Sequence, residues 1–216
     1  MPPVDAVRIE EMINYFSYNY NVPKEKYPFA IHSELTNCPW NGNHQLLLVG
    51  LQAKEIEKES LPPSNLVFLL DVSGSMNAHN KLPLVKSAMQ MLVNELRPND
   101  RVAIVVYAGA AGLVLESTPG NQKQKIMESI ENLNAGGSTA GGEGLRLAYK
   151  TARENFTEGG NNRIILATDG DFNVGVSSTS EMERLVEKER ESGIFMTVLG
   201  FGMGNYKDDK METIAD

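Results

Sequence analysis

The sequence predicts an α/β domain with a doubly wound, mostly parallel open sheet and helices on both of its faces. From residue 66 onward, short and nearly continuous apolar runs alternate with longer amphipathic segments. Strands that are apolar on both sides are typical of a parallel sheet buried between helices. The segments between the runs place apolar residues at helical spacing, which predicts the covering helices.

Four apolar runs are the predicted parallel strands. They are "LVFLL" at 66–70, "RVAIVVY" at 101–107, "RIILAT" at 163–168 and "IFMTVLGFG" at 194–202. A fifth run, "GLVLES" at 112–117, follows its predecessor too closely for a helical crossover. We therefore predict an antiparallel edge strand there.

Helical patterns fill the intervals between these runs. The predicted helices are Leu84 to Leu96, Ile126 to Leu133, Leu145 to Phe156 and Met182 to Glu191. In the first of them Val85, Ala88 and Leu92 lie on one stripe, and Pro98 ends the helix before the next strand.

The first sixty residues have a different pattern and are predicted to form a separate N-terminal region, 1–60. "DAVRIEEMINYF" has the apolar spacing of a short amphipathic helix, and "FAIHSELT" and "HQLLLVGLQA" flank the turn-forming "CPWNGN". An Asn-Gly pair between apolar runs favours a β-hairpin. We predict a short N-terminal helix and a β-hairpin extension, followed by the main domain at 65–216.

Composition excludes several classes of function. The net charge of -8 and a pI near 5.0 argue against nucleic-acid binding, because a phosphate-binding surface is basic. No stretch approaches the about 18 consecutive apolar residues of a membrane-spanning helix, so we expect a soluble chain without direct membrane insertion. Cys38 is the single cysteine, which excludes an internal disulfide and a cysteine-based zinc set.

Oxygen-bearing side chains gather in the loops that should follow the strands. In an open α/β sheet, ligands bind at the carboxyl ends of the strands. The segments "DVSGS", "NAGGSTAGGEG" and "DGDFN" together supply Asp71, Ser73, Ser75, Thr139, Asp169 and Asp171. Oxygen ligands without histidine or cysteine favour magnesium or manganese, with calcium as a further candidate, over zinc or copper.

Two arrangements of such a site are chemically consistent. If both aspartates bind a divalent ion directly, its charge is cancelled, and the site is structural or activates water. If Ser73, Ser75 and Thr139 bind directly while the aspartates act mainly through waters, the ion keeps net positive charge and an open position. The second arrangement favours an external carboxylate as the last ligand. Gly74 lets the chain turn tightly enough for the two serines to face one point.

These motifs resemble the metal-ion-dependent adhesion site of von Willebrand factor type A domains. The resemblance rests on "DVSGS", on the threonine of "GGSTAGG" and on the aspartate of "ATDG", in the family's order, and it extends from about Asn65 to the end of the chain. It implies that the metal ligands are Asp71, Ser73, Ser75, Thr139 and Asp169. The segments "VRIEEMINYF" and "CPWN" further resemble bacterial YfbK-like proteins of this family.

The resemblance implies a Rossmann-like fold and a non-enzymatic binding module. A bound magnesium or manganese ion would accept an Asp or Glu carboxylate from a protein partner. It also implies the bacterial cell envelope, periplasmic or surface, with a lipid anchor in the full-length protein. The family fold adds a strand and a helix beyond the pattern that ends at Asp216, so we expect a domain truncated before them.

Each residue also has a plainer interpretation. Asp71 and Ser73 could cap a following helix, Thr139 could cap the next one, Asp171 could organise a turn, and His79 could be a solvated loop residue. For Asp71, Ser73 and Thr139, the complete set of motifs favours metal binding over helix capping. Asp171 is more often a turn residue, and His79 is more often a solvated loop residue.

An enzyme is the main alternative function. An aspartate at the end of the first strand of the domain also resembles magnesium-dependent phosphotransferases of the haloacid-dehalogenase type, with Asp71 as the nucleophile. Those enzymes need a second acid two residues later, and here Ser73 occupies that position. The sequence therefore favours the binding module over the phosphotransferase.

Overall fold

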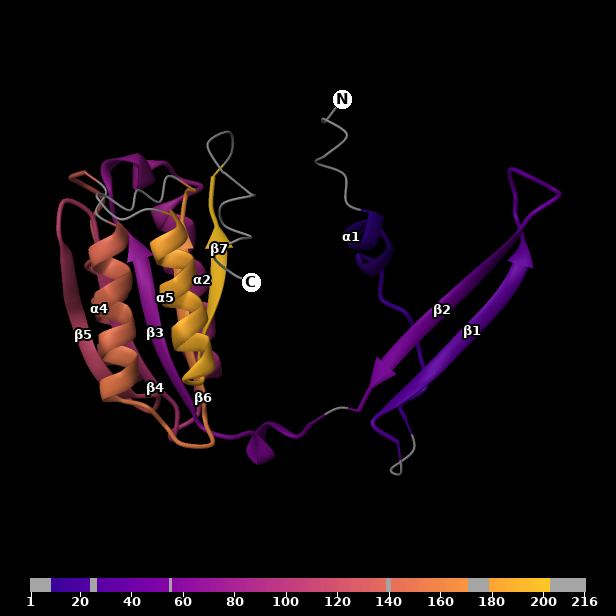
Figure 1. Cartoon of the computed structure of the whole chain (residues 1–216), viewed down its shortest axis with the longest axis horizontal. Helices are drawn as coiled ribbons and strands as arrows, with labels where there is room; N and C mark the ends of the chain where they lie inside the picture. Colours follow the sequence, from indigo (N-terminus) through magenta and orange to yellow (C-terminus); the bar gives the residue numbers. More distant parts are fainter. Residues whose placement is uncertain (1–8, 24–26, 55, 139–140, 171–178, 203–216) are drawn as a thin grey trace. The chain divides into compact units, whose positions relative to one another are not determined.

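The computed structural model describes most of the chain as two compact units. The units are Met1–Leu61 and Pro62–Asp216, and each is considered by itself (Figure 1). The structure describes residues 9–23, 27–54, 56–138, 141–170 and 179–202. No helix within these ranges is long and apolar enough to cross a membrane.

The second unit is built on a five-stranded sheet with the strand order β5-β4-β3-β6-β7. The strands are β3 (Ser64–Asp71), β4 (Arg101–Tyr107), β5 (Ala111–Pro119), β6 (Asn161–Thr168) and β7 (Ile194–Gly200). β3 pairs in parallel with β4 and β6, β6 pairs in parallel with β7, and β5 pairs antiparallel with β4 at the edge. The predicted mostly parallel sheet and its antiparallel edge strand are confirmed.

Helices cover both faces of this sheet, as predicted. They are α2 (Leu82–Glu95), α3 (Lys123–Glu131), α4 (Gly141–Glu154) and α5 (Thr179–Glu191). Figure 1 shows α4 and α5 in front of the strands and α2 behind them. Two buried clusters follow this division, one with apolar residues of α4 and α5 and the other with those of α2 and α3.

The central strand β3 supplies both clusters because its side chains alternate between the faces. Val67 and Leu69 belong to the cluster under α4 and α5, whereas Leu66, Phe68 and Leu70 belong to the one under α2 and α3. Burial of an apolar side chain of this size contributes about 1.5 to 3 kcal/mol. The continuous apolar run therefore anchors the carboxyl end of β3 in the middle of the sheet.

The order of the strands reverses beside β3. After β3 the chain builds β4 and β5 on one side, and α4 then returns it to the other side for β6 and β7. β3 and β6 run in parallel up to the pair Leu70 and Ala167. Their carboxyl ends thus meet at a topological switch point, which is where open α/β sheets bind ligands.

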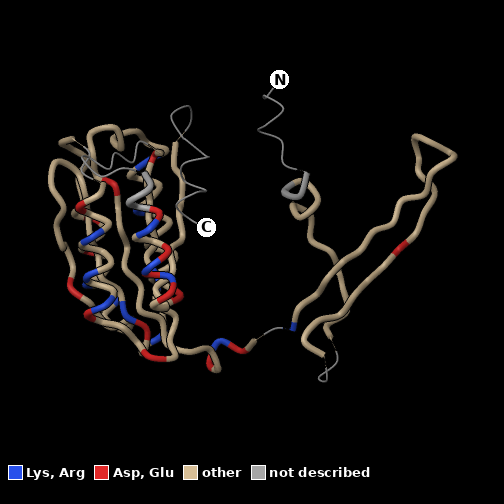
Figure 2. Tube along the Cα trace, in the orientation of Figure 1, with Lys and Arg blue, Asp and Glu red and all other residues tan. Residues whose placement is uncertain are grey.

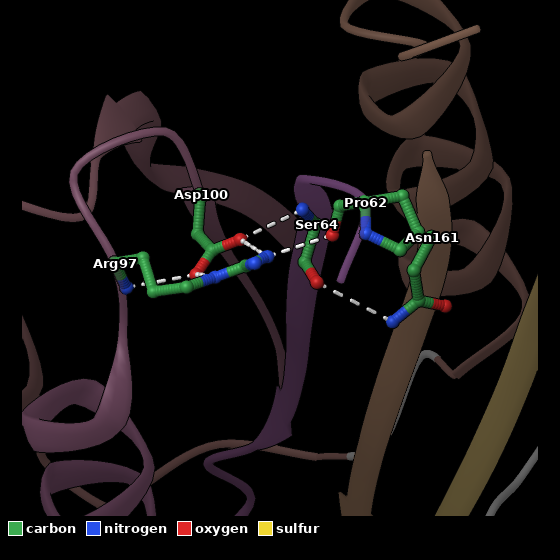
Figure 3. A network of polar contacts seen from close by, with 5 residues as sticks. All are labelled: Pro62, Ser64, Arg97, Asp100 and Asn161. Atoms are coloured by element: carbon green, nitrogen blue, oxygen red, sulfur yellow. Dashed lines mark hydrogen bonds and ion pairs between the residues drawn. The ribbon is translucent and has the colours of Figure 1, made fainter. Parts of the chain in front are cut away.

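A polar network ties together the opposite end of the sheet (Figure 3). Asp100 accepts hydrogen bonds from the Ser64 amide at 2.8 Å and from the Arg97 amide at 2.8 Å, and Arg97 Nη2 donates to the Pro62 carbonyl at 2.7 Å. Burial alone raises the pKa of Asp100, but the Arg97 and Ser64 hydrogen bonds and the Arg97 charge outweigh it and lower the pKa below its usual value. The network fixes the start of β3 against the loop between α2 and β4.

The first unit contains the predicted short helix and hairpin. Its elements are α1 (Ile9–Asn14), the antiparallel pair β1 (Phe29–Asn37) and β2 (Gln45–Ala53), and the short 3-10 helix η2 (Lys58–Ser60). Glu34 is the only Asp, Glu, Lys or Arg between residues 29 and 53 of the sequence. Figure 2 accordingly shows the charged residues concentrated in the second unit and in the segment before it.

Candidate metal centre

The DVSGS loop turns sharply at the carboxyl end of β3. Asp71 is fully buried as the last residue of the strand, and its Oδ1 accepts a hydrogen bond of 2.9 Å from the Ser73 amide. The hydroxyls of Ser73 and Ser75 lie 3.1 Å apart, with Ser73 buried and Ser75 exposed. The loop therefore directs a carboxylate and two hydroxyls to one place that is open to solvent on the side of Ser75.

The glycine-rich segment that leads to Thr139 is hydrogen-bonded to this loop. The Gly136 amide donates to the Val72 carbonyl at 2.8 Å, and the Gly74 amide donates to the Gly137 carbonyl at 3.0 Å. Gly137 has a φ of 79°, and a Cβ there would lie 3.3 Å from the Gly109 amide nitrogen. Only glycine adopts this conformation in this space at little cost. Thr139 itself lies outside the described residues.

The second buried carboxylate comes from the neighbouring strand. Asp169 directly follows β6 and is 1% exposed. Thr168 Oγ1 donates to Asp71 Oδ2 at 3.4 Å and accepts the Gly170 amide at 3.2 Å. The end of β6 is thus joined to the end of β3, and the two aspartates lie at the same edge of the sheet. Asp171 lies outside the described residues.

The electrostatics of this edge favour a cation. Burial raises the pKa of Asp71 above its usual value; the Ser73 hydrogen bonds oppose that rise, and the charge of Asp169 adds to it. Burial and then the charge of Asp71 raise the pKa of the Tyr107 hydroxyl. Lys81 Nζ donates to Asp169 Oδ2 at 2.8 Å. Positive charge beside two carboxylates removed from water at this edge stabilises their ionised forms.

Three residues at this edge were not predicted from the sequence. Lys81 lies before the first turn of α2, Tyr107 ends β4 and Thr168 ends β6. No motif marks Lys81 or Tyr107. Thr168 stands in the same "ATDG" segment that indicated Asp169, so its place at a strand end was the one available signal.

The capping interpretation does not account for the loop. Ser73 precedes the 3-10 helix η3 (Gly74–Asn77), and within the described residues its side chain makes no capping hydrogen bond to that helix. Lys81, not Asp71 or Ser73, precedes α2. His79 is exposed, as expected of a solvated loop residue. Asp71 instead accepts hydrogen bonds from the Ser73 amide and from Thr168 Oγ1, and the Ser73 hydroxyl lies against that of Ser75.

The donor set fits a hard divalent cation. It combines the carboxylates of Asp71 and Asp169 with the hydroxyls of Ser73 and Ser75, all oxygen donors. The described part of the chain contains no group of three or more His, Cys, Asp or Glu side chains that could hold a metal. The hydroxyls of Ser73 and Ser75 are the further oxygen donors beside Asp71.

The sequence from residue 65 onward matches a known protein family. Residues 65–216 match the model of the von Willebrand factor type A domain. The chain belongs to the von Willebrand factor type A domain family. Residues 1–48 match a second model, described as von Willebrand factor. Type A domains typically mediate metal-dependent protein interactions.

Two proteins that this chain resembles are longer than it. YfbK of Escherichia coli (strain K12) is 48% identical over 223 residues, which cover 100% of this chain and 39% of YfbK. The chain therefore spans about two fifths of that relative. A solved von Willebrand factor type A structure from Catenulispora acidiphila has a TM-score of 0.61 at 19% identity, covering 93% of this chain and 45% of the other.

A further solved structure of the same fold carries a metal. Proximal thread matrix protein 1 from the mussel byssus, with a zinc-occupied adhesion-site motif, has a TM-score of 0.56 at 27% identity. The match covers 72% of this chain and 39% of the mussel protein.

Proposed function

We propose that this type A domain is a metal-dependent protein-binding module. A magnesium or manganese ion, with calcium as a third candidate, is held by Asp71, Ser73, Ser75, Thr139 and Asp169. A protein partner completes the site with an Asp or Glu carboxylate. The observation that carries the proposal is the meeting of two buried carboxylates and two hydroxyls at the carboxyl ends of β3 and β6.

The residues of the site have different tasks in this proposal. Ser73 and Ser75 present neutral oxygens, which leave positive charge on a bound ion and so favour an anionic partner. Asp71 orients the loop through the Ser73 amide, and its buried carboxylate supplies negative charge behind the hydroxyls. Because Ser75 is exposed, a partner side chain can reach the ion from solvent without a change in the sheet.

Metal binding is tested by calorimetric titration of the chain with magnesium and manganese. We expect Ser73→Ala and Asp71→Ala to abolish measurable binding while the far-ultraviolet circular dichroism stays that of the wild type. Ser87→Ala is the matched control, because Ser87 is exposed on α2 and, among the described residues, its hydroxyl donates within its own helix to the Pro83 carbonyl at 3.1 Å. Equal metal affinity in Ser73→Ala and Ser87→Ala would contradict the proposed ligand set.

Partner recognition is tested by capture on the immobilised chain in magnesium and in chelator. We expect a specific partner to be released by chelator, recovered by magnesium and missed by Ser73→Ala. Neutralising a single Asp or Glu of the captured partner should have the same effect as chelator. Capture that continues unchanged without metal would exclude the carboxylate-bridging mechanism.

The phosphotransferase alternative makes a different prediction. Magnesium-dependent hydrolysis of a phosphate ester that disappears in Asp71→Asn would favour that enzyme class. We propose instead that the domain is not an enzyme. Family membership supports this, and so does Ser73, which stands where the second acid of such an enzyme is needed.

We also propose a location in the bacterial cell envelope, with anchoring outside this segment. The proposal follows from the resemblance to YfbK-like proteins and is tested by fractionating cells that produce the full-length protein. Recovery of that protein in the cytosolic fraction would contradict it.

A further inference from the structure

Lys81 places an ammonium group on one of the proposed metal ligands. Its Nζ lies 2.8 Å from Asp169 Oδ2, and the two side chains are 12% and 1% exposed. The residues are 88 positions apart in the chain, so the contact is a product of the fold and not of local sequence. A cation of the protein itself is therefore present at the edge where a metal ion is expected.

The fold holds this lysine in position along its whole length. The Lys81 amide donates to the Ala78 carbonyl at 3.0 Å, and the Lys81 carbonyl accepts the first backbone hydrogen bond of α2 from Val85 at 2.9 Å. Its aliphatic stem passes over Gly202, where a Cβ would lie 2.7 Å from Lys81 Cε and 3.3 Å from Cγ. Gly202 lies beside the site because the Phe201 amide donates to the Thr168 carbonyl at 2.9 Å. A side chain at position 202 would therefore collide with the stem of Lys81 in this position.

The charges at the site explain why a lysine is needed there. Without metal, the ionised carboxylates of Asp71 and Asp169 contribute two negative charges in a place shielded from water, and Lys81 compensates one of them. Removing one partner of a buried ion pair strongly destabilises a fold. A divalent ion beside Asp169 would remove that need and would in turn repel the ammonium group.

We propose that Lys81 is an internal counter-ion that competes with the metal for Asp169. The inference rests on the metal site proposed above. In the metal-free domain, Lys81 stabilises Asp169; when metal binds, the ammonium group leaves Asp169 for solvent. Lys81 thereby weakens the affinity for metal and lets the domain stay folded without it. Metal occupancy then responds to the metal concentration instead of being permanent.

The test compares Lys81→Met and Lys81→Gln with the wild type and with Lys86→Met. Lys86 is a matched control, since it lies on α2, the helix that Lys81 precedes, and donates to the Glu131 carbonyl at 2.8 Å. Titration calorimetry with magnesium and manganese should show about tenfold or tighter binding for both Lys81 variants, equivalent to about 1.4 kcal/mol. Lys86→Met should bind like the wild type.

Thermal unfolding distinguishes a lysine that competes with the metal from one that only stabilises the fold through an ion pair. In chelator both Lys81 variants should melt below the wild type, and saturating magnesium should raise their melting temperatures more than that of the wild type. Should Lys81→Met not fold in chelator, its folding on addition of magnesium would support the proposal, and Lys81→Gln supplies the affinity.

The outcomes separate this inference from the proposed function. If the wild type binds metal and both Lys81 variants bind it equally or more weakly, Lys81 is not a competitor and the inference is overturned, while the metal site stands. If neither the wild type nor any variant binds magnesium or manganese, the metal site itself is wrong and the inference falls with it.

Discussion

The amide of Gly74 donates a hydrogen bond of 3.0 Å to the carbonyl of Gly137, which joins the DVSGS loop to the segment that leads to Thr139. The contact brings together two segments more than sixty positions apart in the sequence. Gly137 has a positive φ, and a Cβ there would lie 3.3 Å from the Gly109 amide nitrogen, so glycine is favoured at this position. The geometry of the candidate site thus depends on a residue that is not itself a ligand.

Gly137→Ala should therefore weaken both the fold and the site. We expect a loss of about 1 to 2 kcal/mol in the free energy of unfolding, because a side chain is strained at this φ, together with lower magnesium affinity. Urea unfolding and calorimetry measure the two effects. Gly136→Ala is the matched control: Gly136 has no positive φ and no atom within 4 Å of an added Cβ. Equal stability of the two variants would contradict the role of Gly137.

Asp71→Asn should stabilise the metal-free domain while removing metal binding. The pKa of Asp71 is raised in the fold, so its ionised form is less favourable there than in the unfolded chain. The stability that protonated Asp71 contributes is complete below its pKa in the unfolded chain, about 3.9. That stability is lost as the pH rises through its pKa in the folded protein. In chelator at neutral pH the variant should melt above the wild type, and the difference should vanish in acid.

Magnesium should reverse this order, because it stabilises only the protein that binds it. On acidification, the affinity of the wild type for magnesium should fall. Because the pKa of Asp71 is raised, that fall should begin at a higher pH than it would for a site with an ordinary aspartate. Melting scans over pH, with and without magnesium, measure both effects. An Asp71→Asn protein that melts below the wild type in chelator at every pH would show that the buried charge is compensated.

Asp100→Asn should destabilise the domain far from the candidate site. The Asp100 carboxylate accepts from Arg97 and Ser64 at the start of β3, and these bonds lower its pKa. A lowered folded pKa gives stability that is present above the unfolded pKa of about 3.9 and is lost as the pH falls through the folded pKa. At neutral pH we expect a loss of about 2 kcal/mol in the free energy of unfolding.

The pH dependence of this loss of stability shows whether it comes from the charge of Asp100 or from the packing of its side chain. The difference between wild type and Asp100→Asn in urea unfolding should shrink as the pH falls below about 4, where the wild-type carboxylate is protonated in the unfolded chain. A difference that stays constant down to acid pH would assign the effect to packing. Magnesium affinity should not change, since the network lies at the opposite end of β3 (Figure 3).

Asn162→Ala should be among the more damaging polar substitutions. The Asn162 side chain is buried, its Oδ1 accepts from the Thr157 amide at 2.8 Å and from Asn65 Nδ2 at 3.1 Å, and its Nδ2 donates to the Thr157 carbonyl at 2.9 Å. Its removal leaves buried groups without partners, which should cost about 3 kcal/mol in the free energy of unfolding.

The adjacent Asn161 gives the control for this prediction. It is only partly buried, and its side chain makes one long contact of 3.5 Å to Ser64 Oγ. Asn161→Ala should change the free energy of unfolding by less than about 1 kcal/mol. Urea unfolding of the two variants measures this difference. Equal losses in the free energy of unfolding would show that replacing any residue at this end of β6 is destabilising, and that the buried hydrogen bonds of Asn162 are not the cause.

The elements of the type A domain were predictable because their apolar spacing is local. "LVFLL" is apolar on both faces, and it forms the central strand β3. The ends of helices were less well predicted, as α3 shows: its apolar stripe begins at Ile126, but the helix begins at Lys123. Its first turn is polar, so the stripe marks only the part that contacts the core.

The proximity of the candidate ligand side chains was predictable from the same local patterns, whereas their role as metal ligands stays a prediction. Asp71, Ser73, Ser75 and Asp169 each follow an apolar run, and the carboxyl ends of parallel strands meet at one edge of the sheet. Thr139 lies outside the described residues, so its place in the site stays a prediction. The structure joins the segment before it to the DVSGS loop through Gly136 and Gly137.

The sequence by itself determined the α/β class, the run of strands and helices, and the oxygen-bearing loops, because all of these depend on residues close together in the chain. Only the tertiary structure decided the strand order and placed Lys81 on Asp169. That contact joins the start of α2 to the end of β6, and Gly202 after β7 leaves the space for it. A contact between three elements far apart in sequence has no local pattern, since it arises from packing in three dimensions.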